Sequence, residues 1–146
     1  MVRILLIQGA NMEYLGKRQP EIYGTTTAAE LDTMLLEYAG AHGHELDIFY
    51  TNIEGEAINR IYQADRGDTD GLIMNPAGFN YAGYALRDCL KAVSLPYIEV
   101  HMTNIERRGI KSVLIEEADG VIAGLGVQSY ILGLEAMFYL LEQNKI

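Results

Sequence analysis

The sequence predicts a three-layer α/β fold, in which a parallel sheet lies between two layers of helices. Short runs rich in Val, Ile and Leu alternate with longer segments whose apolar residues recur with helical period. The short runs show little polar alternation, as expected for strands buried on both faces and joined by right-handed crossovers through helices. A chain of 146 residues has the usual size of one domain, so we expect a single domain over residues 1–146.

Five runs have the length and composition of buried strands. Turn-forming residues such as Gly, Pro, Asn and Asp stand at or beside their ends. The predicted strands are residues 2–7, 45–50, 71–74, 97–100 and 120–123. Because helical segments separate the first four of these runs, the sequence predicts a parallel sheet of five strands.

Four segments have the pattern of helices. They are residues 28–41, 54–64, 82–93 and 128–143. The first opens with the capping box Thr27-x-x-Glu30, and the last carries an apolar stripe that includes Leu134 and Leu141. The connection over 104–119 has no clear apolar period, so we expect a loop with at most one helical turn.

The composition excludes several classes of partner. Acidic residues outnumber basic ones by 20 to 11, which gives a net charge of −9 and predicts that nucleic acid and anionic membranes are not partners. No apolar run is long enough to span a bilayer. The single cysteine, Cys89, cannot form an intrachain disulfide, and the chain opens without a signal-peptide pattern, so we expect a cytoplasmic protein. Three histidines without CxxC or HExxH spacing predict no metal site.

The chemistry is expected in the loops that follow the strands, because parallel sheets bind ligands beyond the carboxyl ends of their strands. The first of these loops runs to about residue 24 without a secondary-structure signal, a length that is typical of functional or mobile loops. Its opening, Gly9-Ala10-Asn11, lacks the glycine spacing of a dinucleotide fingerprint, and no phosphate-binding loop follows. The sequence therefore predicts neither a nucleotide nor a flavin cofactor.

Glu99 and His101 stand two residues apart at the end of a predicted strand, so their side chains point to the same face. A carboxylate that accepts a hydrogen bond from the imidazole fixes its tautomer and leaves the other nitrogen free as a general acid. The alternative is a structural ion pair at the end of a strand.

Tyr23 follows Arg18 by five residues in the long first loop. A phenol becomes a useful base near neutral pH only when a nearby cation stabilises the phenolate, and Arg18 could supply that charge. The alternative is that Tyr23 anchors the loop and Arg18 is solvated. Asn11 and Asn75 each follow a buried strand and could bind an oxygen-rich ligand or a water, or could simply form turns.

Several motifs together resemble the type II 3-dehydroquinate dehydratases in order and spacing, over nearly the whole chain. The motifs are Gly9-Ala10-Asn11, LGKRQPEIYG over 15–24, NIEGE over 52–56, Asn75-Pro76, ALRD over 85–88 and EVHMTN over 99–104. The resemblance implies a flavodoxin-like three-layer sandwich with a five-stranded parallel sheet. It also implies a cofactor-free enzyme that assembles as a homo-dodecamer, a tetramer of trimers.

The resemblance also implies roles for particular residues. Tyr23, with Arg18 as its counter-charge, would remove a proton beside the ketone of a cyclic β-hydroxy ketone. Asn11 would help to hold a water on the enolate. His101, supported by Glu99, would protonate the departing hydroxyl group.

Substrate binding is implied for a second set of residues. Asn75 would contact a substrate hydroxyl, and the backbone of Met102 and Thr103 would receive the substrate carboxylate. Asp88 would reach the site of an adjacent subunit. Tyr81 stands where the family has a substrate-binding histidine.

The sequence departs from the family pattern mainly in substrate recognition. Tyr81 replaces a histidine, Glu13 stands where an amide is expected, and Ile53 replaces a histidine in the Asn-His-Glu motif. The loop over 105–112 is shortened, and Arg107, Arg108 and Lys111 remain open as replacements for the family's second substrate-binding arginine. Glu13 is expected to lower the affinity for a carboxylate substrate, because it adds a negative charge.

Three functions are consistent with these residues. The first is a hydro-lyase that converts 3-dehydroquinate to 3-dehydroshikimate in the shikimate pathway of aromatic amino acid biosynthesis. The second is a divergent paralogue with the same enolising chemistry on another hydroxy-keto compound. The third is a non-catalytic binding or assembly protein on the same scaffold. Glu99 with His101 argues against the third, because a buried acid-base pair is typical of a functional site.

Overall fold

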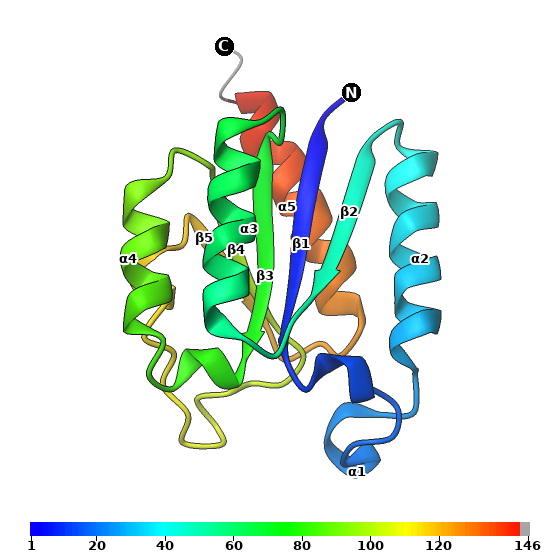
Figure 1. Ribbon diagram of the computed structural model, residues 1–146. Coiled ribbons are helices and arrows are strands. Elements are labelled where there is room, and N and C mark those ends of the chain that lie inside the picture. Colours follow the sequence, from blue (N-terminus) through cyan, green and yellow to red (C-terminus); the bar gives the residue numbers. More distant parts are fainter. Residues whose placement is uncertain (144–146) are drawn as a thin grey trace.

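A computed structural model describes residues 1–143 as a parallel sheet covered by helices on both faces (Figure 1). The strands are β1 (Arg3–Ala10), β2 (Glu45–Tyr50), β3 (Gly71–Ala77), β4 (Tyr97–His101) and β5 (Gly120–Ala123). Their order across the sheet is β2-β1-β3-β4-β5, and every neighbouring pair is parallel. The predicted fold class and all five predicted strands are confirmed.

The helices are α1 (Pro20–Tyr23), α2 (Ala28–Ala41), α3 (Glu54–Arg66), α4 (Tyr84–Ala92) and α5 (Gln128–Gln143). Short 3₁₀ turns cover Met12–Tyr14 (η1), Gly78–Asn80 (η2) and Ile115–Glu117 (η3). The capping box at the start of α2 is formed as predicted, with both hydrogen bonds between Thr27 and Glu30 present. The connection between β4 and β5 is mostly loop with one helical turn, as predicted.

Two differences from the predicted elements lie at the carboxyl ends of the strands. β1 and β3 each extend three residues further than the sequence pattern predicted, to Ala10 and Ala77, because the two strands pair in register through these residues. The loop after β1 also contains two short helical segments, η1 and the single turn α1. Segments of three or four residues are too short to show a helical period in the sequence. Tyr23 is the last residue of α1.

Each face of the sheet packs into its own hydrophobic core. Helices α2 and α5 cover one face, where Leu31, Leu35 and Leu134 meet the inward side chains of β1 and β3. Helices α3 and α4 cover the other, where Ile61 and Leu86 are fully buried. Burial on both faces explains why the strands read as continuous apolar runs.

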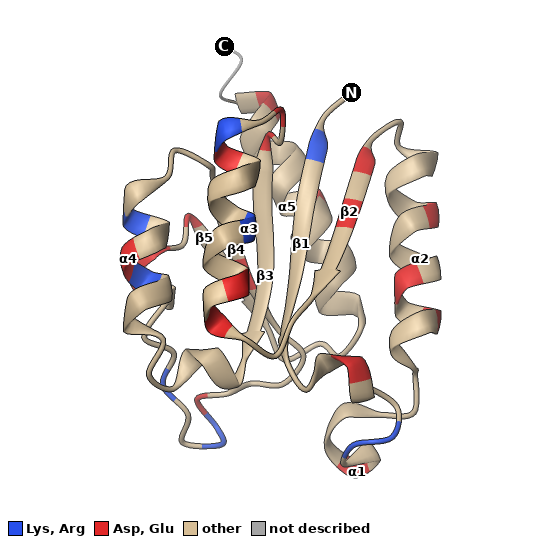
Figure 2. Ribbon diagram, in the orientation of Figure 1, with Lys and Arg blue, Asp and Glu red and all other residues tan. Residues whose placement is uncertain are grey.

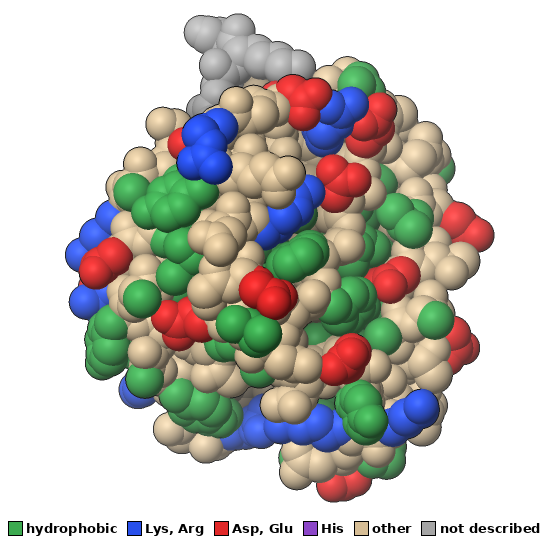
Figure 3. Space-filling view, viewed as in Figure 1, with side chains coloured by type: hydrophobic (Ala, Val, Ile, Leu, Met, Phe, Trp, Pro, Cys, Tyr) green, Lys and Arg blue, Asp and Glu red, His purple; other side chains and the backbone are tan. Residues whose placement is uncertain are grey.

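The carboxyl ends of the strands lie at the lower edge of the molecule in Figure 1, together with α1 and the loop after β4. Lys and Arg residues stand in both of these loops, although the chain as a whole is acidic (Figure 2). The space-filling view shows basic side chains along the same lower edge (Figure 3). No helix within residues 1–143 is long and apolar enough to cross a membrane.

Candidate active site

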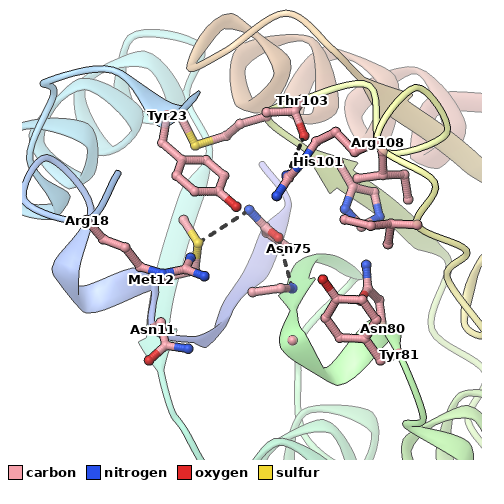
Figure 4. Close-up of a pocket in the computed structure, with 15 residues that line it drawn as sticks. Asn11, Met12, Arg18, Tyr23, Asn75, Asn80, Tyr81, His101, Thr103 and Arg108 are labelled. Atoms are coloured by element: carbon pink, nitrogen blue, oxygen red, sulfur yellow. Dashed lines mark hydrogen bonds between the residues drawn. The ribbon is translucent and has the colours of Figure 1, made fainter. Parts of the chain in front are cut away.

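A pocket opens at the carboxyl edge of the sheet, where the loops after β1, β3 and β4 meet. Its lining contains eight of the ten predicted site residues: Asn11, Arg18, Tyr23, Asn75, Tyr81, His101, Met102 and Thr103. In Figure 4, Tyr23, Asn75 and Tyr81 direct their polar atoms toward a common space. Side chains from segments that are far apart in the sequence are thus brought together as the parallel topology predicts.

The other two predicted residues lie outside this lining. Glu99 precedes His101 by two residues in β4, contacts its imidazole and has no exposed surface. Asp88 is exposed on α4 and is not among the residues that line the pocket. A role for Asp88 in the site of an adjacent subunit therefore stays a prediction.

The predicted contact between Glu99 and His101 is formed. Nε2 of His101 lies 2.6 Å from Oε2 of Glu99, and both side chains are buried. A carboxylate only accepts hydrogen bonds, so Nε2 is the donor and Nδ1 is the imidazole nitrogen left for chemistry. The phenol of Tyr97 donates a second hydrogen bond, of 2.6 Å, to Oε1 of the same carboxylate.

Tyr23 has an arginine from each of two loops beside its ring. The guanidinium carbon of Arg18 lies 5.3 Å from the ring centre, and that of Arg108 lies 5.5 Å from it. Nη1 of Arg108 also donates a hydrogen bond of 3.1 Å to Oγ1 of Thr103, which fixes the loop after β4 against the pocket. Both distances to the ring are within the range of cation–π contact.

Three basic residues stand in the shortened loop, and Arg108 is the one whose side chain lines the pocket. Lys111, from the same loop, forms an ion pair with Glu106 at the surface. Arg107 is exposed and is not part of the pocket lining. Of the three positions that the sequence left open for a second arginine, the structure brings Arg108 to the site.

Asn75 is held by a buried network of hydrogen bonds. Its Nδ2 donates to the hydroxyl of Tyr130 over 2.8 Å, and that hydroxyl donates to Oε1 of Gln8 over 2.8 Å. Its Oδ1 accepts from the backbone N–H of Ala77 over 3.0 Å. Burial raises the pKa of Tyr130 above its ordinary value, which keeps the phenol protonated as a donor.

Asn11 stands in the left-handed region, with φ of 70°, at the start of η1. Its backbone N–H donates a hydrogen bond of 2.7 Å to Oδ1 of Asn52. Nδ2 of Asn52 in turn donates to Oε1 of Glu13 over 2.8 Å. The loop after β2 therefore positions the loop after β1 at the edge of the pocket.

Two of the three altered recognition positions lie away from this pocket. Glu13 and Ile53 line a second, neighbouring cavity together with Asn52 and Glu56. The Glu13 carboxylate accepts a hydrogen bond from Asn52 in that cavity, so the structure places this added negative charge outside the lining of the pocket. Tyr81 is the altered position that does line the pocket, and 60% of its surface is exposed.

Sequence reasoning did not single out Tyr97, Tyr130 or Asn80, and it left Arg108 as one of three alternatives. Asn80 lines the pocket from η2. The alternation of side chains along β4 places Tyr97 on the same face as Glu99, so the Tyr97 contact had a signal in the sequence. The Tyr130 contact joins α5 to β3 and had none, because no local pattern pairs positions that far apart.

Comparison with known proteins places these features in one family. The family described as Dehydroquinase class II matches residues 2–138. The 3-dehydroquinate dehydratase of Thioalkalivibrio sulfidiphilus is 42% identical, over 99% of this chain and 100% of that protein. The 3-dehydroquinate dehydratase of Actinobacillus pleuropneumoniae serotype 5b is 44% identical, over 100% of this chain and 95% of that protein.

Solved structures agree with this match. The type II dehydroquinase from Butyrivibrio crossotus superposes with a TM-score of 0.89 at 35% identity, over 93% of this chain and 97% of that one. A 3-dehydroquinate dehydratase-like protein from Bifidobacterium longum superposes with a TM-score of 0.74 at 28% identity, over 97% and 99% of the two chains.

Proposed function

Because the chain belongs to the class II dehydroquinase family, we propose that it removes water from 3-dehydroquinate and releases 3-dehydroshikimate. This activity makes the protein a hydro-lyase of the shikimate pathway. The observation that carries the proposal is the convergence of Tyr23, Arg18, Asn11, Asn75 and His101 on one pocket of a chain that matches named dehydratases over its full length.

The first chemical step forms an enolate. The Tyr23 phenolate takes a proton from the carbon beside the substrate ketone, and the electron pair of that C–H bond moves onto the ketone oxygen. The guanidinium groups of Arg18 and Arg108 stabilise the phenolate before it accepts the proton. Asn11 holds a water that donates a hydrogen bond to the enolate oxygen.

The second step expels the hydroxyl group. The enolate reforms the ketone, a carbon–carbon double bond forms beside it, and the carbon–oxygen bond to the leaving hydroxyl breaks. His101 gives its proton to that hydroxyl, which leaves as water. The contact between Nε2 and Glu99 supports this assignment, because the carboxylate stabilises the charged imidazole that carries the proton.

Substrate recognition uses the carboxyl end of β3 and the loops after β3 and β4. The backbone N–H groups of Met102 and Thr103 receive the substrate carboxylate, and Asn75 binds a ring hydroxyl. Arg108 takes the place of the family's second substrate-binding arginine, since it lines the pocket and already holds Thr103. Tyr81 contributes a phenol where the family has a histidine.

An absorbance assay tests the proposed reaction. Purified protein is mixed with 3-dehydroquinate, and the ultraviolet absorbance of the conjugated enone is followed over time. We expect the absorbance to rise at a rate proportional to enzyme concentration, and to fall to the uncatalysed rate with His101→Ala. No rise at high enzyme concentration would overturn the proposed substrate and favour a divergent paralogue with another hydroxy-keto substrate.

The proposal extends to assembly as a homo-dodecamer, a tetramer of trimers, in the cytoplasm. Tyr81 and Tyr84 are 60% and 53% exposed, and Asp88 is exposed one helical turn beyond Tyr84. Exposed tyrosines suit subunit contacts, because they present a large apolar ring with a polar end. A mass near twelve times 16.2 kDa by light scattering supports the dodecamer, and a fully active monomer overturns it.

A further inference from the structure

The Glu99 carboxyl group is fully buried and has two side-chain hydrogen-bond partners in the described part of the chain. Oε2 binds Nε2 of His101, and Oε1 binds the hydroxyl of Tyr97, each over 2.6 Å. A buried carboxylate is costly unless hydrogen bonds satisfy both oxygens, and charge-assisted hydrogen bonds of this length are among the stronger ones in proteins. Tyr97 therefore supplies one of the two side-chain hydrogen bonds of the Glu99 carboxyl group.

Tyr97 is itself fixed in place. It is 2% exposed in β4 and packs in the core between the sheet and the helices α3 and α4, with Leu72, Met74 and Leu86. Burial, and after it the charge of Glu99, raises the pKa of Tyr97 well above its ordinary value of about 10. The phenol thus stays protonated and can act toward Glu99 only as a donor.

The alternation of side chains in β4 lines up these three residues. Tyr97, Glu99 and His101 point to one face of the sheet, and the chain of hydrogen bonds runs from the core toward the pocket. Of the three, His101 lines the pocket. The position of its imidazole therefore depends on the Glu99 carboxylate, whose other oxygen accepts a hydrogen bond from Tyr97.

We propose that Tyr97 is a positioning residue for the general acid. By holding Oε1 of Glu99, its phenol directs Oε2 at Nε2 of His101, so that Nδ1 faces the substrate. The inference rests on the proposed function, in which His101 protonates the departing hydroxyl group. Without the phenol, Oε1 would be a buried acceptor with no side-chain donor, and the carboxylate would be free to rotate away from His101 or to take up a proton.

A variant that removes only the hydroxyl tests this role. Tyr97→Phe keeps the ring and the packing of β4, so we expect kcat to fall about 10-fold or more while KM stays within about 2-fold, because the acid acts in the chemical step and not in binding. Tyr38→Phe is the matched control. It also removes a phenol from a tyrosine–glutamate hydrogen bond, that of Tyr38 with Glu135, which joins α2 to α5 outside the pocket. An unchanged kcat in Tyr97→Phe would overturn the role.

A double-mutant cycle separates positioning from packing. If Tyr97 acts through the Glu99 carboxylate, adding Tyr97→Phe to Glu99→Gln lowers kcat by less than about 2-fold, although the same change is costly in the native background. An equal loss in both backgrounds means that Tyr97 acts by packing alone, which overturns the proposal.

A spectroscopic measurement keeps the inference testable without turnover. In protein labelled with ¹³C at the glutamate carboxyl carbons, and assigned with Glu99→Gln, we expect the Glu99 signal of the wild type at the position of an ionised carboxylate. We also expect the His101 Nε2 proton signal to move in Tyr97→Phe and to stay in place in Tyr38→Phe. A protonated Glu99 in the wild type, or an unmoved His101 signal, overturns the inference. An inactive wild type with these signals as expected would instead overturn the proposed function.

Discussion

The guanidinium group of Arg108 lies over the ring of Tyr23, with 5.5 Å between its carbon and the ring centre, although the two residues come from different loops. Arg18 lies at nearly the same distance, 5.3 Å, from within the loop of Tyr23 itself. The proposed base is therefore surrounded by two cations, and one of them also holds the loop that follows β4 through Thr103.

Arg108 is expected to be the arginine of its loop that matters for activity. Arg108→Ala removes a cation from the pocket and the bond to Thr103, so kcat/KM should fall at least about 10-fold, which corresponds to the loss of a charged hydrogen bond. Arg107→Ala is the matched control, because it removes the same charge from the neighbouring exposed position. Steady-state kinetics of both variants with 3-dehydroquinate check the expectation, and equal effects of the two would refute it.

Tyr23→Phe is expected to lower kcat by about 100-fold or more, the scale of losing a general base. The fold should not change, because the substitution removes one hydroxyl from the end of α1. Tyr14→Phe, in the adjoining turn η1, is a control with an exposed phenol outside the pocket lining. Comparable turnover by Tyr23→Phe and the wild type would end the assignment of Tyr23 as the base.

The two altered recognition positions Tyr81 and Glu13 should respond differently to reversal. Tyr81→His restores a group that can carry positive charge in the pocket lining, so the KM for 3-dehydroquinate should fall while kcat changes little. Glu13→Asn should leave KM within about 2-fold, because the Glu13 side chain binds Asn52 at the second cavity. A larger improvement from Glu13→Asn than from Tyr81→His would contradict the positions of these side chains.

Stability is expected to fall at alkaline pH because the pKa values of several tyrosines are raised in the folded protein. Burial raises the pKa of Tyr130 and of Tyr97, and the hydrogen bond to Glu135 raises the pKa of Tyr38 to about 12. A phenol in the unfolded chain releases its proton near pH 10, so these groups contribute stability that is complete below about pH 10 and is lost as the pH rises toward 12.

Urea unfolding between pH 8 and pH 11 measures this loss. Tyr130→Phe should be less stable than the wild type at pH 8, by about 1 kcal/mol for the lost hydrogen bonds, but its free energy of unfolding should fall less steeply with pH. Phenolate absorbance over the same range should show the buried Tyr97 and Tyr130 ionising only as the protein unfolds. If the free energy of unfolding fell equally steeply with pH in the two proteins, Tyr130 would have the same pKa in the folded and unfolded states, and the prediction would be wrong.

The sequence was sufficient for the sheet and for most of the pocket because both follow from local patterns. The five strands were visible as buried runs. Asn75 and His101 lie at the carboxyl ends of two of them, and Asn11 and Tyr23 lie in the connection after a third, so the parallel topology gathers all four. The pairing of Glu99 with His101 was also predictable, because side chains two apart in a strand share a face.

What could not be predicted depends on contacts between distant segments. Whether Arg107 or Arg108 enters the pocket is decided by the path of an irregular loop, in which neighbouring side chains point in different directions. The hydrogen bond from Asn52 to Glu13 joins two such loops. It directs the Glu13 carboxylate toward the second cavity, which the position of Glu13 in the sequence did not reveal. The hydroxyl of Tyr130 meets Asn75 only because α5 packs on the same face of the sheet as that side chain.

The two buried supports of the pocket lie on opposite faces of the sheet. Gln8, Asn75 and Tyr130 belong to the side covered by α2 and α5, whereas Tyr97 and Glu99 belong to the side covered by α3 and α4. In the proposed function, the backbone of the sheet therefore separates the residues that support substrate binding from those that support the proposed acid. Under the proposed function, substitutions on one face of the sheet can change the binding of the ring hydroxyl while the other face keeps the support of the proposed acid. Recognition and proton donation can then evolve separately within one site.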